Sequence, residues 1–70
     1  MLFYLKNRNK TIKILRKNKG LTAKELALKI KCNTIDIKRI DNSKLKNISK
    51  DMRDRLMPIF RGDMYDNIPW

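Results

Sequence analysis

The stretch from Leu21 to Asp41, LTAKELALKIKCNTIDIKRID, decides the fold of this chain. It contains two helix starts in which a small polar residue is followed three positions later by an acidic one: Thr22 with Glu25, and Asn33 with Asp36. Such a pair caps a helix because each residue can bond the backbone N–H of the other. The starts lie only 11 residues apart, which leaves room for two short helices and a tight turn. The stretch therefore predicts a helix-turn-helix.

The apolar spacing gives both helices a face to bury. The helix expected from residue 22 to about 31 carries a stripe of three apolar residues, Leu26, Ala27 and Ile30. The helix expected from residue 33 to about 41 turns two isoleucines inward, Ile37 and Ile40. This leaves four side chains on its outer face: Thr34, Ile35, Lys38 and Arg39.

Before this motif, a helix is expected from about residue 9 to 19, with Ile12 and Leu15 on its apolar face. Gly20 follows it, at the position where glycine commonly terminates a helix. Residues 2–5, LFYL, lack polar alternation and are compatible with a short strand or with an extended segment packed on the core. The sequence leaves strand and helix open for them.

After the motif, a polar loop at 42–47 leads to a last helix that begins at Ser49, a favourable N-cap. Its apolar face is formed by Met52 and Leu56, and Pro58 ends or kinks it. The tail that follows concentrates aromatic residues, namely Phe60, Tyr65 and Trp70. These aromatics close a thin core or form a dimer contact, and both alternatives stay open.

Together these elements predict one all-α domain over residues 1–70, a compact bundle of four to five helices with its core at 9–57 and its tail at 58–70. A chain of 70 residues can bury one modest core and has no room for an enclosed substrate cleft. There is no histidine and no nucleophile beside a base, so neither an enzyme nor a catalytic, cofactor or metal site is expected. The lone Cys32 excludes an internal disulfide and is expected as a buried core thiol.

The charge is extreme for this length. The chain carries a net +11, with seven basic residues and no acidic one between Lys6 and Lys19. The tail from residue 58 carries −1, so the remainder carries +12. An AT-rich coding sequence explains part of the lysine count but not this clustering. A polyanionic partner is expected, with nucleic acid first and an anionic membrane surface second.

The N-terminal apolar run is too short for a signal peptide, and no apolar stretch approaches membrane-spanning length. A single cysteine suits a reducing compartment. We therefore expect a cytoplasmic protein that has neither a membrane partner nor a small-molecule ligand.

Four segments in order, IKILRKNKGLT, KELALKI, IDIKRIDNSK and SKDMRDRL, resemble the Cro/repressor-type helix-turn-helix family of lambda-repressor-like DNA-binding domains. The resemblance spans about residues 12–56. It implies double-stranded DNA as partner, and an ion pair between Arg16 and Asp41 that ties the first family helix to the end of the recognition helix. Single domains of this kind read a half-site, so a homodimer is expected.

The chain departs from the family pattern at three positions. The inter-helix turn carries Lys31 instead of glycine, and a left-handed backbone there would cost a non-glycine residue about 1 kcal/mol. Ala23 replaces a glutamine that commonly contacts phosphate. Arg8 replaces an apolar residue, which suggests that the first family helix starts late and that residues 2–5 supply the missing core contacts.

The resemblance and the outer face of the second motif helix give the candidate site. Base contacts are expected from Thr34, Ile35, Lys38 and Arg39: the hydroxyl to a base or phosphate, Ile35 to a thymine methyl or else to a protein partner, and the guanidinium to guanine O6 and N7. Lys38 can also reach phosphate. Asp36 is assigned to the cap, since phosphates repel a carboxylate. Phosphate contacts are expected from Lys13, Lys17, Thr22, Lys24, Asn33, Asn42, Lys44 and Lys46.

The predicted function is that of a sequence-specific DNA-binding transcriptional regulator, a repressor of the Cro type, that reads the major groove with the helix at 33–41. The alternative is a protein interaction module, such as an antitoxin-like adaptor that docks an acidic partner. RNA binding is less favoured because no aromatic stacking platform or Gly-rich RNA motif is present.

Overall fold

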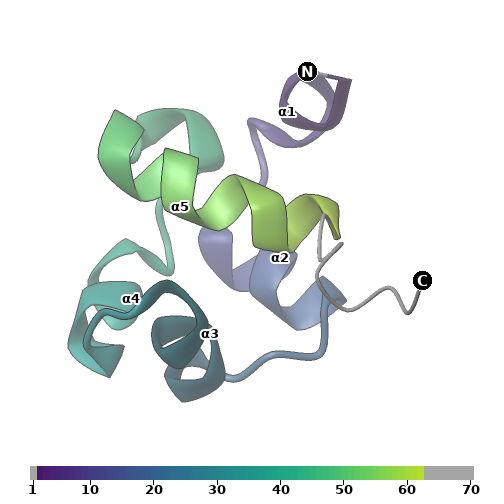
Figure 1. Ribbon diagram of the computed structural model, residues 1–70. Helices are drawn as coiled ribbons and strands as arrows, with labels where there is room; N and C mark the ends of the chain where they lie inside the picture. Colours follow the sequence, from purple (N-terminus) through teal and green to yellow (C-terminus); the bar gives the residue numbers. More distant parts are fainter. Residues whose placement is uncertain (1, 63–70) are drawn as a thin grey trace.

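The computed structural model describes residues 2–62, and these form five α-helices and one short 3₁₀ helix (Figure 1). No β-strand occurs in this range, so the predicted all-α class is confirmed. The described part is a compact globule. In chain order its elements are α1 Leu2–Asn7, α2 Ile12–Asn18, α3 Ala23–Ile30, α4 Thr34–Ile40, η1 Leu45–Asn47 and α5 Lys50–Arg61.

One hydrophobic core lies where α2, α3, α4 and α5 meet. The predicted stripes supply most of it: Leu26 and Ile37 are fully buried, and Ile30 is 8 % exposed. Ile40 is only partly buried and packs at the edge. Within residues 2–62, the buried hydrophobic residues are Ile12, Leu15, Leu26, Ala27, Ile30, Ile37, Leu45, Ile48, Leu56 and Phe60.

The helix starts follow their predicted caps. Thr22 accepts a hydrogen bond from the N–H of Glu25 at 3.1 Å, and the Glu25 carboxylate accepts one from the N–H of Thr22 at 2.9 Å. At α4, the Asp36 carboxylate accepts from the N–H of Asn33 at 3.2 Å. The hydroxyl of Ser49 caps α5. These bonds satisfy N–H groups that a helix otherwise leaves without partners.

At the N-terminus, residues 2–7 form the helix α1, which decides the choice between strand and helix that the sequence left open. The expected start of the next helix was wrong, because α2 begins at Ile12 instead of about residue 9. The hydroxyl of Thr11 caps α2 by accepting from the N–H of Ile14 at 3.2 Å, which fixes the start of α2 at this position. Phe3 and Tyr4 of α1 pack against the core. This late start and these core contacts agree with the consequence drawn from Arg8.

The last helix was predicted too short. α5 continues through Pro58 to Arg61 and ends at Gly62, whose left-handed backbone (φ 78°) closes the helix. The proline ring removes one backbone hydrogen bond. Burial of Leu56 and Phe60 on either side of it holds the helix together. Phe60 therefore belongs to the core, while the tail aromatics Tyr65 and Trp70 lie outside the described residues.

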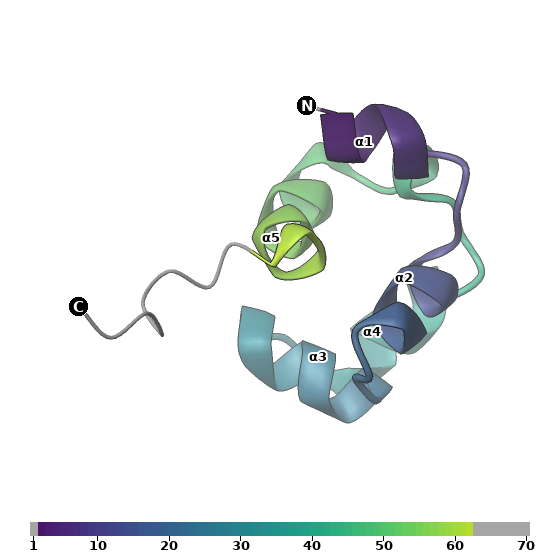
Figure 2. The same ribbon diagram turned by 90° about the vertical axis from the view of Figure 1, so that its right-hand side faces the viewer.

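Two segments that are distant in sequence run side by side, one between α1 and α2 and the other between α4 and η1 (Figure 2). Their backbones are joined by hydrogen bonds from Ile12 N to Ser43 O (3.0 Å), from Lys13 N to Asp41 O (2.9 Å) and from Leu45 N to Lys10 O (2.9 Å). A single antiparallel bridge, Thr11 with Lys44, marks their centre. We call residues 8–13 and 41–46 the paired segments. In the described range, no helix has the length and apolar character needed to cross a membrane.

Candidate nucleic-acid interface

The helix α4 presents a polar and basic stripe to solvent. Ile35 is 56 % exposed, and Lys38 and Arg39 are also exposed. Thr34 is partly buried at the start of the helix. Residues three and four positions apart lie next to one another on a helix, so Ile35, Lys38 and Arg39 share one strip of surface. Three of the four predicted base contacts are thus open to solvent, and the fourth is open in part.

The turn before α4 adopts the left-handed backbone conformation that is unfavourable for a residue other than glycine. Lys31 has φ 58° and ψ 47°, and it is the only non-glycine residue with positive φ in the described range. The N–H of Lys31 donates to carbonyls of the last turn of α3, and the N–H of Cys32 donates to the carbonyl of Ala27 at 2.9 Å. This tight exit from α3 positions the capped start of α4. α3 and α4 pack closely against each other, which gives the helix-turn-helix its fixed shape.

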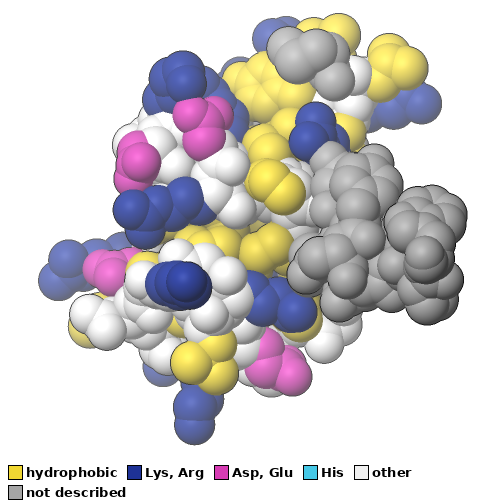
Figure 3. All heavy atoms as spheres, viewed as in Figure 1, with side chains coloured by type: hydrophobic (Ala, Val, Ile, Leu, Met, Phe, Trp, Pro, Cys, Tyr) yellow, Lys and Arg dark blue, Asp and Glu magenta, His cyan; other side chains and the backbone are white. Residues whose placement is uncertain are grey.

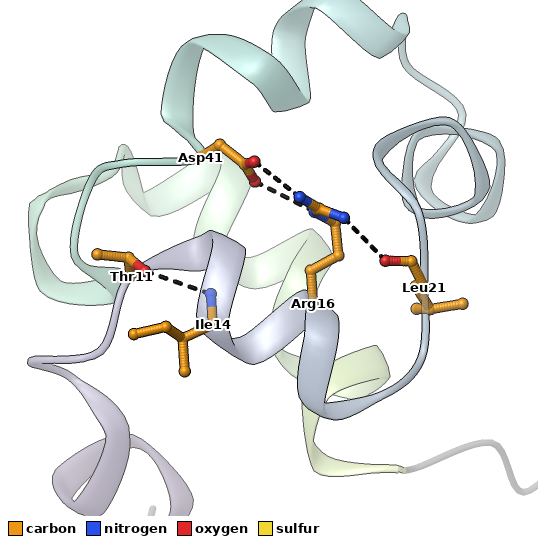
Figure 4. Close-up of polar contacts among 5 residues, drawn as sticks. All are labelled: Thr11, Ile14, Arg16, Leu21 and Asp41. Atoms are coloured by element: carbon orange, nitrogen blue, oxygen red, sulfur yellow. Dashed lines mark hydrogen bonds and ion pairs between the residues drawn. The ribbon is translucent and has the colours of Figure 1, made fainter.

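Arg16 fixes the relative positions of three elements (Figure 4). Its Nε and Nη2 donate to the two carboxylate oxygens of Asp41, at 3.2 and 2.8 Å, and its Nη1 donates to the carbonyl of Leu21 at 2.9 Å. The predicted ion pair is therefore present, in a bidentate form. The hydrogen-bonded carboxylate of Asp41 holds the pKa of the Arg16 guanidinium above its ordinary value. α2, the entry to α3 and the exit from α4 are all joined by this one side chain.

The candidate phosphate contacts lie on the elements that Arg16 joins. All eight are exposed: Lys13, Lys17, Thr22, Lys24, Asn33, Asn42, Lys44 and Lys46. Lys13 is placed beside the end of α4 by its backbone bond to Asp41. Thr22 and Lys24 lie at the start of α3, and Asn42 and Lys44 lie in the loop that leaves α4. The candidate phosphate contacts therefore come from α2, the start of α3, the start of α4 and the chain that follows α4.

Every acidic side chain of the described range caps a helix or forms an ion pair. Glu25 and Asp36 cap helices, and the other three carboxylates take part in ion pairs. Those pairs are Arg16–Asp41, Lys50–Asp54 and Arg55–Asp51. Residues 2–62 contain 18 basic and five acidic side chains, a net +13. No carboxylate is left over to neutralise the lysines that flank α4.

Cys32 lies in the same turn but is only half-buried, where a fully buried thiol was expected. Its Sγ lies 3.6 Å from the carbonyl oxygen of Asn33. Burial raises the pKa of the thiol, and the nearby charge of Asp36 adds to the rise. A raised pKa disfavours the reactive thiolate, in keeping with a packing role.

Some apolar side chains remain on the surface. Leu2 and Leu5 of α1 are 70 % and 60 % exposed, and Leu28 of α3 is 68 % exposed. In Figure 3, hydrophobic side chains gather over α1 and between α1 and α5. The guanidinium of Arg53 lies 5.3 Å from the ring centroid of Tyr4 at the same place. α1 thus exposes two large apolar side chains, and it lies apart from the stripe on α4 (Figures 1 and 2).

In comparisons with known proteins, no protein-family model, curated protein or solved structure matches the chain.

Sequence reasoning missed two features near the site. The first is the bond from Arg16 to the carbonyl of Leu21, which extends a predicted pair into a link between three elements. The second is the alignment of the paired segments, which places residues before α2 beside the loop after α4. The cap at Thr11 is a local signal for the late start of α2. The alignment has no local signal because its bonds join backbone groups.

Proposed function

We propose that this protein is a sequence-specific DNA-binding regulator that reads the major groove with α4. The observation that carries the proposal is the solvent-exposed strip of Ile35, Lys38 and Arg39 on α4. The strip lies within a helix-turn-helix that Arg16 and Asp41 hold rigidly. A polar, basic helix edge next to lysines that no carboxylate neutralises suits a groove bordered by phosphates.

Base reading would come from the chemistry of this strip. The guanidinium of Arg39 can donate two parallel hydrogen bonds to O6 and N7 of one guanine, a contact worth roughly 1–3 kcal/mol of discrimination. Ile35 can pack on a thymine methyl, and Thr34 can donate to a base or to a phosphate. These groups favour a half-site that contains guanine and thymine.

Affinity would come mainly from the surrounding lysines. Ammonium groups on α2, α3 and the loop after α4 would neutralise phosphates and release their counterions. Such contacts fix orientation without carrying sequence information. One domain of this size covers one half-site, so we propose binding as a homodimer to a palindrome.

The direct test is selection of binding sites from a random pool of duplex DNA by the full-length protein. The expected result is a short palindromic consensus. Its binding constant should fall with salt, with a slope of about −0.9 per phosphate neutralised. Enrichment of no sequence, with equal affinity for every duplex, would leave only generic attraction to polyanions.

A second candidate, a protein interaction module, is favoured by one observation. α1 exposes Leu2 and Leu5 beside an open hollow of about 270 Å³ lined by Tyr4, Arg53, Asp54 and Met57. This positively charged protein with exposed leucines on α1 would suit a partner that is acidic and presents an apolar patch. Under this function, Thr34→Ala with Arg39→Ala would leave partner binding intact, whereas Leu2→Ser with Leu5→Ser would abolish it.

A further inference from the structure

The paired segments bring four basic residues from two distant parts of the sequence onto adjoining backbones. Arg8 and Lys10 belong to the segment before α2, and Lys44 and Lys46 to the segment after α4. The amide of Lys46 donates to the carbonyl of Arg8 at 3.0 Å, and the amide of Leu45 donates to the carbonyl of Lys10 at 2.9 Å. We call these four residues the cation cluster.

The cluster is open to solvent and is not internally neutralised. All four side chains are exposed, and none forms an ion pair within residues 2–62. The one carboxylate in the paired segments, Asp41, is already held by both donors of Arg16. Like charges held together in this way repel one another, and the repulsion is relieved when a polyanion binds.

The backbone keeps the cluster in a fixed place relative to α4. The second paired segment follows α4 directly, and Lys13 N bonds to Asp41 O at its end. The core residue Leu45 anchors the far side, with no exposed surface. When the first turn of a recognition helix enters the groove, its last turn and the following loop lie near a backbone strand. With α4 docked in this way, the cluster would face the duplex backbone beyond the half-site.

We infer that the cation cluster is a second DNA contact, which binds the phosphates that flank the half-site read by α4. This inference rests on the proposed function and extends it: Arg8 and Lys10, which precede the helix-turn-helix, become part of the binding surface. The partner is the duplex backbone, so the contact adds affinity and lengthens the footprint without adding base preference.

The experiment compares the full-length wild type, the double variant Arg8→Gln/Lys10→Gln, and a control that removes the same charge elsewhere. The control is Lys19→Gln/Lys29→Gln, since both lysines are exposed and line a hollow with Ile59 and Gly62 beyond the other end of α2. Binding is measured against salt on the selected duplex and on a scrambled one, each with short and with long flanks. Circular dichroism checks that all three proteins are folded.

The cluster variant should bind the palindrome with a salt slope shallower by about 2 per protomer, and so by about 4 for the homodimer, because each protomer loses two phosphate contacts. It should lose the same factor in affinity on both sequences, and the loss should vanish on the duplex with short flanks. The control should keep a slope close to that of the wild type. An equal change in the two double variants would overturn the inference, because net charge alone would then explain it. Failure of the proposed function would look different: the wild type itself would not distinguish the selected from the scrambled duplex.

Discussion

The helix-turn-helix and the N-terminal helix are attached to the bundle in different ways. α2, α3 and α4 meet around Arg16, whose side chain is 10 % exposed and makes three hydrogen bonds to the chain ends of α3 and α4. α1 contributes no fully buried residue and rests on the half-buried rings of Phe3 and Tyr4. The helix-turn-helix, whose geometry would have to match a DNA groove, is thus fixed by directional hydrogen bonds. The added helix is held by general packing.

Among the substitutions that test this comparison, removal of Arg16 is expected to cause the largest loss of stability. Arg16→Ala leaves the Asp41 carboxylate, which is 15 % exposed, without its partner, and leaves the carbonyl of Leu21 without its donor. We expect a loss of about 3 kcal/mol in the free energy of unfolding, measured by urea denaturation. The double variant Arg16→Ala/Asp41→Ala should lose little more than the single one, since both act on one bond.

The matched control is the exposed pair Lys50–Asp54, at 2.7 Å on α5. Lys50→Ala should change the free energy of unfolding by less than about 1 kcal/mol, because solvent screens an exposed pair. Equal losses at Arg16 and Lys50 would show that the buried, bidentate pair of Arg16 stabilises the protein no more than an exposed pair does.

A gain in stability is expected at the turn of the motif. Lys31→Gly replaces a side chain held at φ 58° by the residue that adopts this conformation freely. We expect about 1 kcal/mol of added stability in the same denaturation assay. The control Lys24→Gly, on the regular helix α3, should instead lose about 1 kcal/mol. A destabilised Lys31→Gly protein would show that the lysine makes contacts that outweigh its backbone strain.

A substitution that weakens the attachment of α1 is expected to cause a smaller loss of stability. Arg53→Gln removes the cation that lies 5.3 Å from the Tyr4 ring centroid. The expected loss is about 0.5–1 kcal/mol, and it should disappear in a Tyr4→Leu background, where no electron-rich ring remains. Hydrogen exchange on α1 amides gives the local readout. Unchanged exchange in Arg53→Gln would mean that this contact does not hold α1.

The smallest effect is expected at the cap of α3. The hydrogen bond from the backbone N–H of Thr22, together with that from its hydroxyl, lowers the pKa of Glu25 below its ordinary value. A lowered pKa in the folded state means that the cap stabilises the protein above about pH 4.5, and that this contribution is lost as the pH falls through the folded value. Glu25→Gln should therefore reduce the slope of stability against pH below this point. A slope identical to that of the wild type would show that the cap is not formed in solution.

Much of the fold could be predicted because its signals are local. The capping pair at Thr22 and Glu25, the stripe of Leu26, Ala27 and Ile30, and the cap at Ser49 each depend on residues within one or two helical turns. The pair of Arg16 and Asp41 is long-range and was available only through the family resemblance. The exposed strip on α4 then follows from the burial of Ile37.

The rest depends on contacts that leave no local pattern. The helical state of residues 2–7 is set by the packing of Phe3 and Tyr4 on the core, because an isolated helix of six residues is not stable. Continuation of α5 past Pro58 depends on the burial of Phe60. The paired segments are joined by backbone groups, which every residue other than proline carries. The DNA function itself stays a prediction.

The most direct measurement compares the wild type with Thr34→Ala/Arg39→Ala on the duplex selected from the random pool and on a scrambled duplex. Both side chains lie on α4, and neither belongs to the buried core, so the fold should persist by circular dichroism. If α4 reads bases, the double variant should lose its preference for the selected duplex, by about 10-fold or more. It should keep most of its salt-dependent affinity for the scrambled duplex. A folded double variant that still prefers the selected duplex as strongly as the wild type would contradict base reading by this helix.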